Sequence, residues 1–336
     1  MPIKRPKTLK ELAALAGVTS GTASRALAGS ELVTPATRDM IVALAREHGF
    51  TPNVSARNLR IRRTGTIGVI IPLGHETEQH VSDPFFITML GLLADALTAR
   101  GYNLLLSRVV PRNDNWFWNF MRSGHVDGVI VIGQSDQSSV LDAVAERYKP
   151  LVVWGGHVAG QAYCSVGSDN FRGGQLAAQH LIDRGCKSLA FFGDPRALEI
   201  GLRLDGCRAA AARAGLSDAL TVLPVHLVAE RARSDIVAFL AATPQPPQGI
   251  VAASDVIAVS ALRALAEAGL AVPGDVKVTG YDGLTLGEHT MPPLTTITQD
   301  LVQGAERLVD IVIRRIAGED IHSVIMQPRL LVRQSS

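Results

Sequence analysis

The chain has 336 residues, 47% of them hydrophobic, and is long enough for two or three domains with substantial cores. No apolar run approaches the roughly 18–20 residues that span a bilayer, and residues 1–12 lack the apolar core of a secretory signal. We therefore expect a cytoplasmic protein without membrane contact.

Charge is distributed unevenly along the chain. The formal net charge is +2, but residues 1–65 hold eleven Lys/Arg against four Asp/Glu, which gives +7 there and −5 elsewhere. A basic N-terminal region on an acidic body favours nucleic acid as a partner, the alternative being a solvated basic tail. The three cysteines lack CxxC spacing, so neither a disulfide framework nor a zinc site is indicated.

The first predicted element is a short helix that starts after Thr8. Thr8 and Glu11 have the spacing of a capping box, and Gly17 supplies a left-handed residue at the other end. The apolar positions follow the i, i+3, i+4, i+7 pattern of one buried stripe: Leu9, Leu12, Ala13 and Ala16. After a turn of three to four residues, Thr19 can cap a second helix, which makes the pair a helix-turn-helix.

The second helix has an unusually small-sided outer face. Its inner face carries Ala23, Ala26 and Leu27, whereas the outer face carries Ser20, Gly21, Thr22, Ser24 and Arg25. Small side chains near its N-terminus would let a helix enter a DNA major groove about 12 Å wide, with Arg25 reaching a base or a phosphate. The alternative is an ordinary exposed surface on a small bundle. A third helix is predicted from Thr34-Pro35 to just before Gly49.

The segment 51–64 brings a specific resemblance. Together with Thr8, Leu12, Ala13, Ala16, Gly17, Val18 and Thr19, it matches the opening and hinge motifs of the LacI/GalR family of bacterial transcription regulators through Pro52, Asn53, Ala56, Arg57 and Leu59. The resemblance implies a hinge helix in which Leu59 enters the minor groove of operator DNA and kinks a base step. A flexible basic linker is the alternative. The residues expected to contact DNA are Thr8, Thr19, Ser20, Gly21, Thr22, Ser24, Arg25, Asn53, Ala56, Arg57 and Leu59.

From Thr66 onward, short apolar strands alternate with helices, which predicts parallel sheets flanked by helices. Two blocks are expected, a first lobe at about 65–165 plus 293–328 and a second at about 166–292 plus 329–336. This is the layout of a periplasmic-binding-protein-like body, an α/β fold of two parallel-sheet lobes, behind an N-terminal all-α helix-turn-helix domain at 1–50. Ligands of such folds lie at the carboxyl ends of the strands, between the lobes.

The family resemblance continues along the body, in the segments 168–185 and 280–297. It implies a pocket arginine at Arg203 and a pocket aspartate at Asp282, which could bracket sugar hydroxyls or a ligand carboxylate. Ser254 stands where the family often has asparagine. Phe86 matches an aromatic that lines the pocket, with Phe85 left to the core. Trp154 is expected either to stack on a sugar or to pack in the core.

Other functions find less support in the sequence. The cluster HETEQH at 75–80 holds potential metal ligands, but its spacing favours a polar loop at the pocket mouth, so no metal and no cofactor are expected. Nucleophile-elbow, P-loop, HExxH and GxGxxG motifs are absent from the sequence, which argues against an enzyme. An exported sugar receptor would lack the basic helix-turn-helix.

We therefore expect a homodimeric repressor of carbohydrate-utilisation genes that binds double-stranded operator DNA under the control of a small-molecule effector. The effector is expected to be a sugar. A nucleobase-type effector is the alternative.

The hinge supplies a first prediction. Asn53 can cap only about two helical turns, whereas a lone helix needs roughly 12 to 15 residues, so we expect it to fold only on operator DNA. Circular dichroism should show a gain of helix when operator is added. Leu59→Ala should weaken specific binding more than non-specific binding, because phosphate contacts survive. Equal losses of affinity for operator and for non-specific DNA would refute the role of Leu59 in kinking the operator.

Overall fold

The computed structural model describes residues 6, 8–50, 63–74 and 76–336, without the side chain of Ser123. The chain divides into two compact units, residues 1–64 and 65–336. Among the described residues, no helix is long and apolar enough to cross a membrane.

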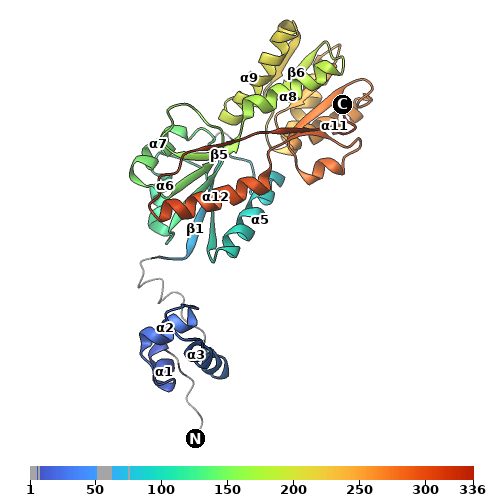
Figure 1. The fold of residues 1–336 in the computed structure, drawn as a ribbon. Coiled ribbons are helices and arrows are strands. Elements are labelled where there is room, and N and C mark those ends of the chain that lie inside the picture. Colours follow the sequence, from blue (N-terminus) through green and yellow to red (C-terminus); the bar gives the residue numbers. More distant parts are fainter. Residues whose placement is uncertain (1–5, 7, 51–62, 75) are drawn as a thin grey trace. The chain divides into compact units, whose positions relative to one another are not determined.

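The described part of the N-terminal unit contains three helices around a small core, drawn in blue in Figure 1. They are α1 (Leu9–Leu15), α2 (Ser20–Leu27) and α3 (Pro35–Glu47). Each begins at a threonine whose hydroxyl accepts a backbone N–H: Thr8 from Glu11, Thr19 from Thr22 and Thr34 from Thr37. The core consists of Leu12, Ala26, Val33, Ile41 and Ala45. The expected helix-turn-helix is thus confirmed in the structure.

The second unit contains two six-stranded sheets, as predicted for a two-lobed α/β body (Figure 1). The first sheet has the order β11-β5-β4-β3-β1-β2 and is parallel throughout, with β1 at Thr66–Pro72, β2 at Asn103–Val109, β3 at Gly128–Ile132, β4 at Leu151–Trp154, β5 at Cys164–Ser168 and β11 at Val324–Met326. The second sheet has the order β12-β10-β9-β8-β6-β7, with β6 at Leu189–Phe192, β7 at Leu220–Leu223, β8 at Gly249–Ala252, β9 at Lys277–Asp282, β10 at Thr295–Thr298 and β12 at Arg329–Leu331. In the second sheet, β12 runs antiparallel to β10.

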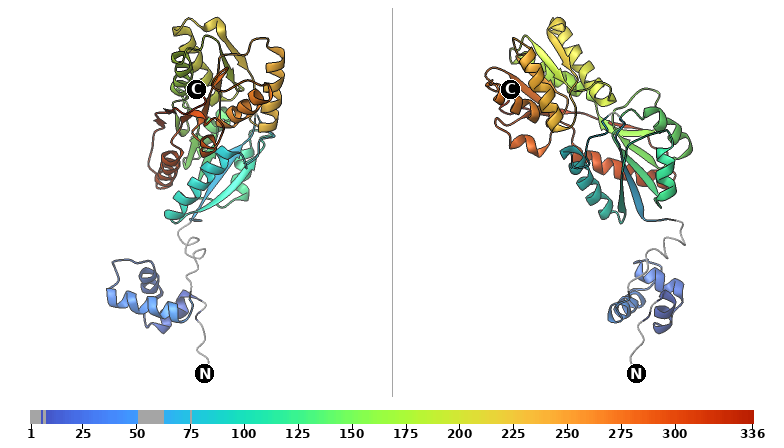
Figure 2. Two further views of the ribbon diagram at one scale, coloured as in Figure 1. Left: turned by 90° about the vertical axis from the view of Figure 1, so that its right-hand side faces the viewer. Right: turned by 180° about the vertical axis from the view of Figure 1, so that it is seen from behind.

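Helices cover both faces of the first sheet (Figure 2). On one face lie α5 (Pro84–Ala99) and α12 (Leu301–Ile316), and on the other α6 (Trp116–Ser123) and α7 (Ser138–Arg147). Strand β1 supplies alternate side chains to the two cores, with Val69 on the α5 side and Ile70 on the α6 side. The second sheet packs with α8 (Asn170–Asp183), α9 (Leu198–Arg213), α10 (Ala229–Ala242) and α11 (Asp255–Glu267). Two 3-10 turns lie at Ser217–Ala219 and Thr285–Glu288.

The chain passes between the sheets three times: after β5, after β10, and between β11 and β12. The sequence-based lobe limits were wrong in two places. Thr295–Thr298 belongs to the second lobe, because β10 extends the second sheet by pairing with β9 and β12. Residues 166–168 belong to the first lobe, because β5 pairs with β4 and β11 through Ser168.

Two glycines allow α8 and α9 to touch through their backbones. A Cβ atom at Gly174 would overlap the carbonyl group of Arg203, and one at Gly206 would overlap the carbonyl group of Phe171. Any larger residue would have to push the helices apart, because the opposing atoms are backbone. This crossing fixes the position of the Arg203 backbone relative to α8, and so the point from which its side chain extends.

The helix crossing supplies a second prediction. Gly206→Ala should lower the free energy of unfolding by about 1–3 kcal/mol, because the added methyl group overpacks a backbone contact. The matched control is Gly91→Ala in α5, where a Cβ atom would meet nothing within 4 Å. That change should stabilise the helix by roughly 0.5–1 kcal/mol. Urea denaturation compares the two, and equal effects would contradict the account of the crossing.

Candidate functional site

The outer face of α2 lies as the sequence predicts. Thr19, Ser20, Gly21 and Arg25 are exposed, and Thr22 and Ser24 are half-buried. The Nε atom of Arg25 donates to the carbonyl oxygen of Gly21 at 3.2 Å, which lays the side chain along its own helix. Thr8 is exposed at the start of α1. The hinge candidates Asn53, Ala56, Arg57 and Leu59 lie outside the described residues.

A pocket lies within the body, at the carboxyl ends of strands from both sheets. It is a recess partly open to solvent, to which β1, β3, β4, β5 and β9 contribute their last residues. All five predicted ligand-binding residues line it: Phe86, Trp154, Arg203, Ser254 and Asp282. The structure therefore brings them together at the place that parallel-sheet topology predicts.

Arg203 is held in one orientation by its surroundings. Its Nε atom donates to the side-chain oxygen of Asn170 at 2.8 Å, and its Nη1 atom donates to the carbonyl oxygen of Ala253 at 2.5 Å. The guanidinium carbon lies 3.7 Å from the ring centroid of Tyr281, a cation–π contact. Because only 8% of the residue is exposed, Arg203 forms a fixed part of the pocket wall.

Asp282 is a buried carboxylate at the end of β9. Its backbone φ of 116° is in a region that side-chain-bearing residues rarely adopt, which turns the carboxylate into the pocket. Its Oδ1 atom accepts from Nε2 of Gln299 at 2.7 Å and lies 3.8 Å from Nη1 of Arg203. Burial raises the pKa of Asp282 despite the opposing effect of Arg203. The pocket thus holds a carboxyl group that is poorly solvated when no ligand is bound.

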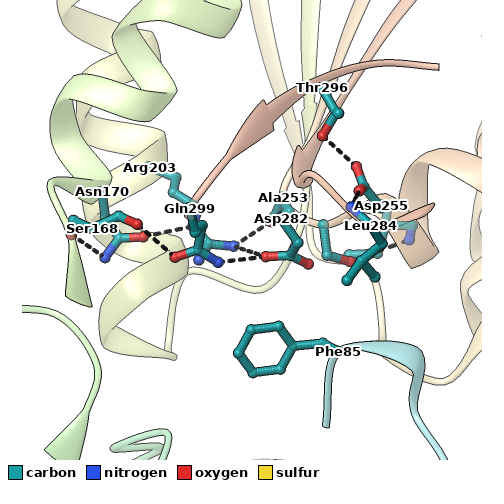
Figure 3. A network of polar contacts seen from close by, with 12 residues as sticks. Phe85, Ser168, Asn170, Arg203, Ala253, Asp255, Asp282, Leu284, Thr296 and Gln299 are labelled. Carbon is teal, nitrogen blue, oxygen red and sulfur yellow. Dashed lines mark hydrogen bonds and ion pairs between the residues drawn. The ribbon is translucent and has the colours of Figure 1, made fainter. Parts of the chain in front are cut away.

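Polar residues that the sequence did not mark as ligand-binding complete a ring around this pair (Figure 3). The hydroxyl of Ser168 donates to the side-chain oxygen of Gln299 at 2.9 Å, and the amide of Asn170 donates to the backbone oxygen of Ser168 at 3.1 Å. Asn170 stands in a recognisable motif, so a signal was present. Gln299 follows a strand without any motif of its own.

The aromatic wall differs in part from the prediction. Phe85 and Phe86 both line the pocket, with their rings edge to face at a centroid distance of 5.7 Å. Phe86 is buried in the core of the first lobe, whereas Phe85 is half-buried. Figure 3 shows Phe85 apart from the polar network, below the carboxylate of Asp282 in that view. Phe85 packs against the core, as expected, and also lines the pocket, which the sequence did not indicate. Trp154 lines the pocket and also packs on Gly304 of α12.

Ser254 and Asp255 have separate structural tasks at the start of α11. The hydroxyl of Ser254 accepts the N–H of Ile257 at 3.2 Å and so caps the helix while facing the pocket. Asp255 is fully buried and accepts from the Thr296 hydroxyl at 2.6 Å and the Leu284 N–H at 2.7 Å. Burial raises the pKa of Asp255. Its contacts join α11 to the loop after β9.

The loop that follows β1 spans the pocket mouth, as expected. Glu78 forms an ion pair with Arg231 of the second lobe at 2.6 Å, and Glu76 accepts the N–H of Leu227 at 3.4 Å. His80 is exposed, and His75 lies outside the described residues. Where the structure describes the chain, no three His, Cys, Asp or Glu side chains are grouped as metal ligands would be.

A helix-turn-helix unit joined to a two-lobed α/β body with a polar pocket defines the class of DNA-binding regulators that carry a ligand-binding domain. The model for bacterial regulatory proteins of the lacI family matches residues 8–53, and that for the periplasmic binding protein-like domain matches residues 178–336. The HTH-type transcriptional regulator CelR of Thermobifida fusca is 32% identical over the whole of both chains. The chain belongs to the lacI family of bacterial transcriptional regulators.

One further relative and one solved structure are similar over nearly the whole chain. The ribose operon repressor of Escherichia coli (strain K12) is 29% identical and covers 98% of this chain and 99% of its own. A solved complex of transcriptional regulator CelR with cellobiose is 29% identical, covers 98% of this chain and 100% of its own, and has a TM-score of 0.69. These relatives are regulators of transcription rather than enzymes.

The buried carboxyl group supplies a third prediction. Because the pKa of Asp282 is higher in the folded chain than in the unfolded chain, the folded state keeps a proton that the unfolded state has lost. The free energy of unfolding should therefore fall as pH rises above the ordinary carboxyl range. Asp282→Asn removes this penalty, so its stability advantage should grow between about pH 4 and pH 8, at no more than about 1.4 kcal/mol per pH unit.

Denaturation curves of both proteins across this pH range measure the difference. The charge of Asp255 also raises the pKa of Asp282, so the difference between the two curves reports on Asp282 together with its interaction with Asp255. Two results would contradict the account. One is a stability advantage of Asp282→Asn that stays constant with pH, and the other is an Asp282→Asn variant that becomes less stable than the unmodified chain as pH rises.

Proposed function

We propose that this regulator is a homodimeric repressor of carbohydrate-utilisation genes, and that an uncharged sugar bound between its lobes releases it from operator DNA. The outer face of α2 reads the major groove, with Arg25 as its long side chain. One such unit covers half of a palindromic site, so two copies of the chain are needed for the whole operator. Thr8 and the hinge residues add backbone and minor-groove contacts.

The observation that carries the choice of a sugar is the charge and hydrogen-bonding balance of the pocket. Its described lining includes three acidic side chains, Asp83, Glu199 and Asp282, against the single guanidinium of Arg203. Arg203 is already bonded to Asn170 and the Ala253 carbonyl group. An anionic effector would find only one cation, and that cation is already bonded within the protein, whereas hydroxyl groups can donate to the carboxyl oxygens and accept from the fork of Arg203.

The aromatic wall supports the same proposal. Phe85, Phe86 and Trp154 offer apolar surface opposite the polar ring, which suits the two faces of a sugar. The relative solved as a complex with cellobiose has the same fold. A nucleobase could also stack on this wall. Its planar edge would leave several of the carboxylates without donors, which makes it the second candidate.

Sugar binding is tested by stability and by DNA release. A thermal-shift comparison of cellobiose, D-ribose, glucuronate and cytidine should single out an uncharged sugar, since a ligand at 100 times its Kd adds about 2.7 kcal/mol to the native state. Fluorescence anisotropy on operator duplexes selected from random DNA should then show that this sugar lowers operator affinity. Stabilisation by cytidine alone would replace the sugar by a nucleobase-type effector, and failure to bind any selected duplex would refute the proposal.

A matched pair of variants ties the effect to the pocket. Arg203→Met should abolish the response to the sugar while operator binding without sugar persists. The control is Arg208→Met on the same helix, whose guanidinium is exposed and pairs with Asp205 at 3.3 Å. This control should respond like the unmodified chain.

A further inference from the structure

Gln299 occupies a short link between the lobes. It lies between the end of β10 in the second lobe and the start of α12 in the first, followed by Asp300, the cap of α12. Only 3% of Gln299 is exposed, and both ends of its amide are bonded. The Nε2 atom donates to Asp282 at 2.7 Å, and the Oε1 atom accepts from Ser168 at 2.9 Å.

The second partner belongs to another crossing. Ser168 is the last residue of β5, directly before the chain enters the second lobe at α8. The next residue, Asp169, donates its N–H to the carbonyl oxygen of Met326 at 2.9 Å, at the third crossing. The side chain of Gln299 therefore links a pocket carboxylate to segments whose backbone angles must change when the lobes rotate.

The amide of Gln299 allows only a few discrete arrangements. With its NH₂ group toward Asp282 and its oxygen toward Ser168, both contacts are satisfied (Figure 3). Rotation by half a turn would place the amide oxygen against the carboxyl group of Asp282, which repels it whenever that group is ionised. A hydroxyl that donates to the same Oδ1 atom of Asp282 competes with the amide. Where the hydroxyl takes the place of the amide N–H at Oδ1, Gln299 shifts, and its bond to Ser168 shifts or breaks with it.

We propose that Gln299 is a positioning residue that transmits ligand contact at Asp282 to the crossing segments, and so to the lobe arrangement that sets operator affinity. The proposal rests on the proposed function for its consequence on DNA. The transmission itself is a property of the body and is measured without DNA or sugar. Two discrete states of one side chain, biased by both sites, are what coupling between sites requires.

The test disturbs Asp282 and reads the crossing at Ser168. Asp282→Gly removes the carboxylate at a backbone angle that glycine tolerates. Amide hydrogen exchange of residues 164–170 in the full chain is then compared with that of residues 138–147 in α7. With Gln299 present, Asp282→Gly should speed exchange at 164–170 by about threefold or more relative to α7, a coupling of the size found between residues in one network.

Breaking the link should abolish this effect. In a chain that already carries Gln299→Met, adding Asp282→Gly should alter exchange at 164–170 by less than about 1.5-fold relative to Gln299→Met alone. Ser168→Ala is a milder way to break the link, and adding Asp282→Gly to it should have an equally small effect relative to Ser168→Ala alone. The control is Gln79→Met. Gln79 is also a buried pocket glutamine paired with an aspartate, Asp83, at 3.1 Å, but it is not on a crossing segment. On that background the acceleration should persist.

Operator affinity separates this inference from the proposed function. Asp282→Gly should change the operator Kd of the unmodified chain by about threefold or more, and the change should vanish on the Gln299→Met background. If Asp282→Gly acted only through a structural defect, it would change the operator Kd by the same factor with Gln299 and with Gln299→Met. Equal exchange responses with and without Gln299 would overturn the inference, even if operator binding is normal. Absence of operator binding with a Gln299-dependent exchange response would overturn only the proposed function.

Discussion

The backbone contact between α8 and α9 is the constraint on which the pocket depends. Gly174 and Gly206 remove the side chains that would separate the helices, so Arg203 leaves α9 close above Tyr281. Gly173 serves the same end, since a Cβ atom there would collide with the Tyr281 ring. The arginine is thus oriented by packing before any ligand arrives. Such preorganisation lowers the cost of binding, because little side-chain freedom remains to be lost.

The pocket is arranged at the expense of stability. Asp282 is buried with a raised pKa and an unusual backbone angle, and its nearest cation lies at 3.8 Å. Asp255, close by, is satisfied by Thr296 and Leu284 and holds the loop after β9 in place. One carboxylate therefore has its hydrogen-bond partners within the protein, while the other still has acceptor capacity for a ligand. Local cost of this kind is common where a site must respond to a ligand.

Local chemistry explains why much of the fold was predictable. The three N-terminal helices are predicted by their threonine caps and by the glycines at their ends, because these signals act over only three or four residues. Strands such as 128–132 are continuous apolar runs, and the sequence predicts them as strands for that reason. Strand β5, at Cys164–Ser168, carries small and polar residues, and only its pairing with β4 and β11 makes it a strand. The lobe limits failed for the same reason, because sheet membership is decided by distant partners.

The site was predictable where a residue stands in a motif and not elsewhere. Arg203 and Asp282 were found through the motifs around them. Gln299 acquires its role only when the crossing segments meet, and nothing in its neighbours along the chain indicates that meeting. Phe85 and Phe86 are adjacent on one helix turn, so the sequence could not assign their exposure to the pocket. Tertiary geometry decided each of these cases.

We expect an uncharged sugar to bind at the Arg203–Asp282 pair and to rearrange the segments that join the lobes. A crystal structure of the full chain with the stabilising sugar bound tests this expectation most directly. The account predicts sugar hydroxyl groups within hydrogen-bond distance of both side chains, and a Gln299 amide displaced from its contact with Ser168. A sugar bound elsewhere, or one bound at the pair with the Ser168–Gln299 contact and the lobe angle unchanged, would contradict it.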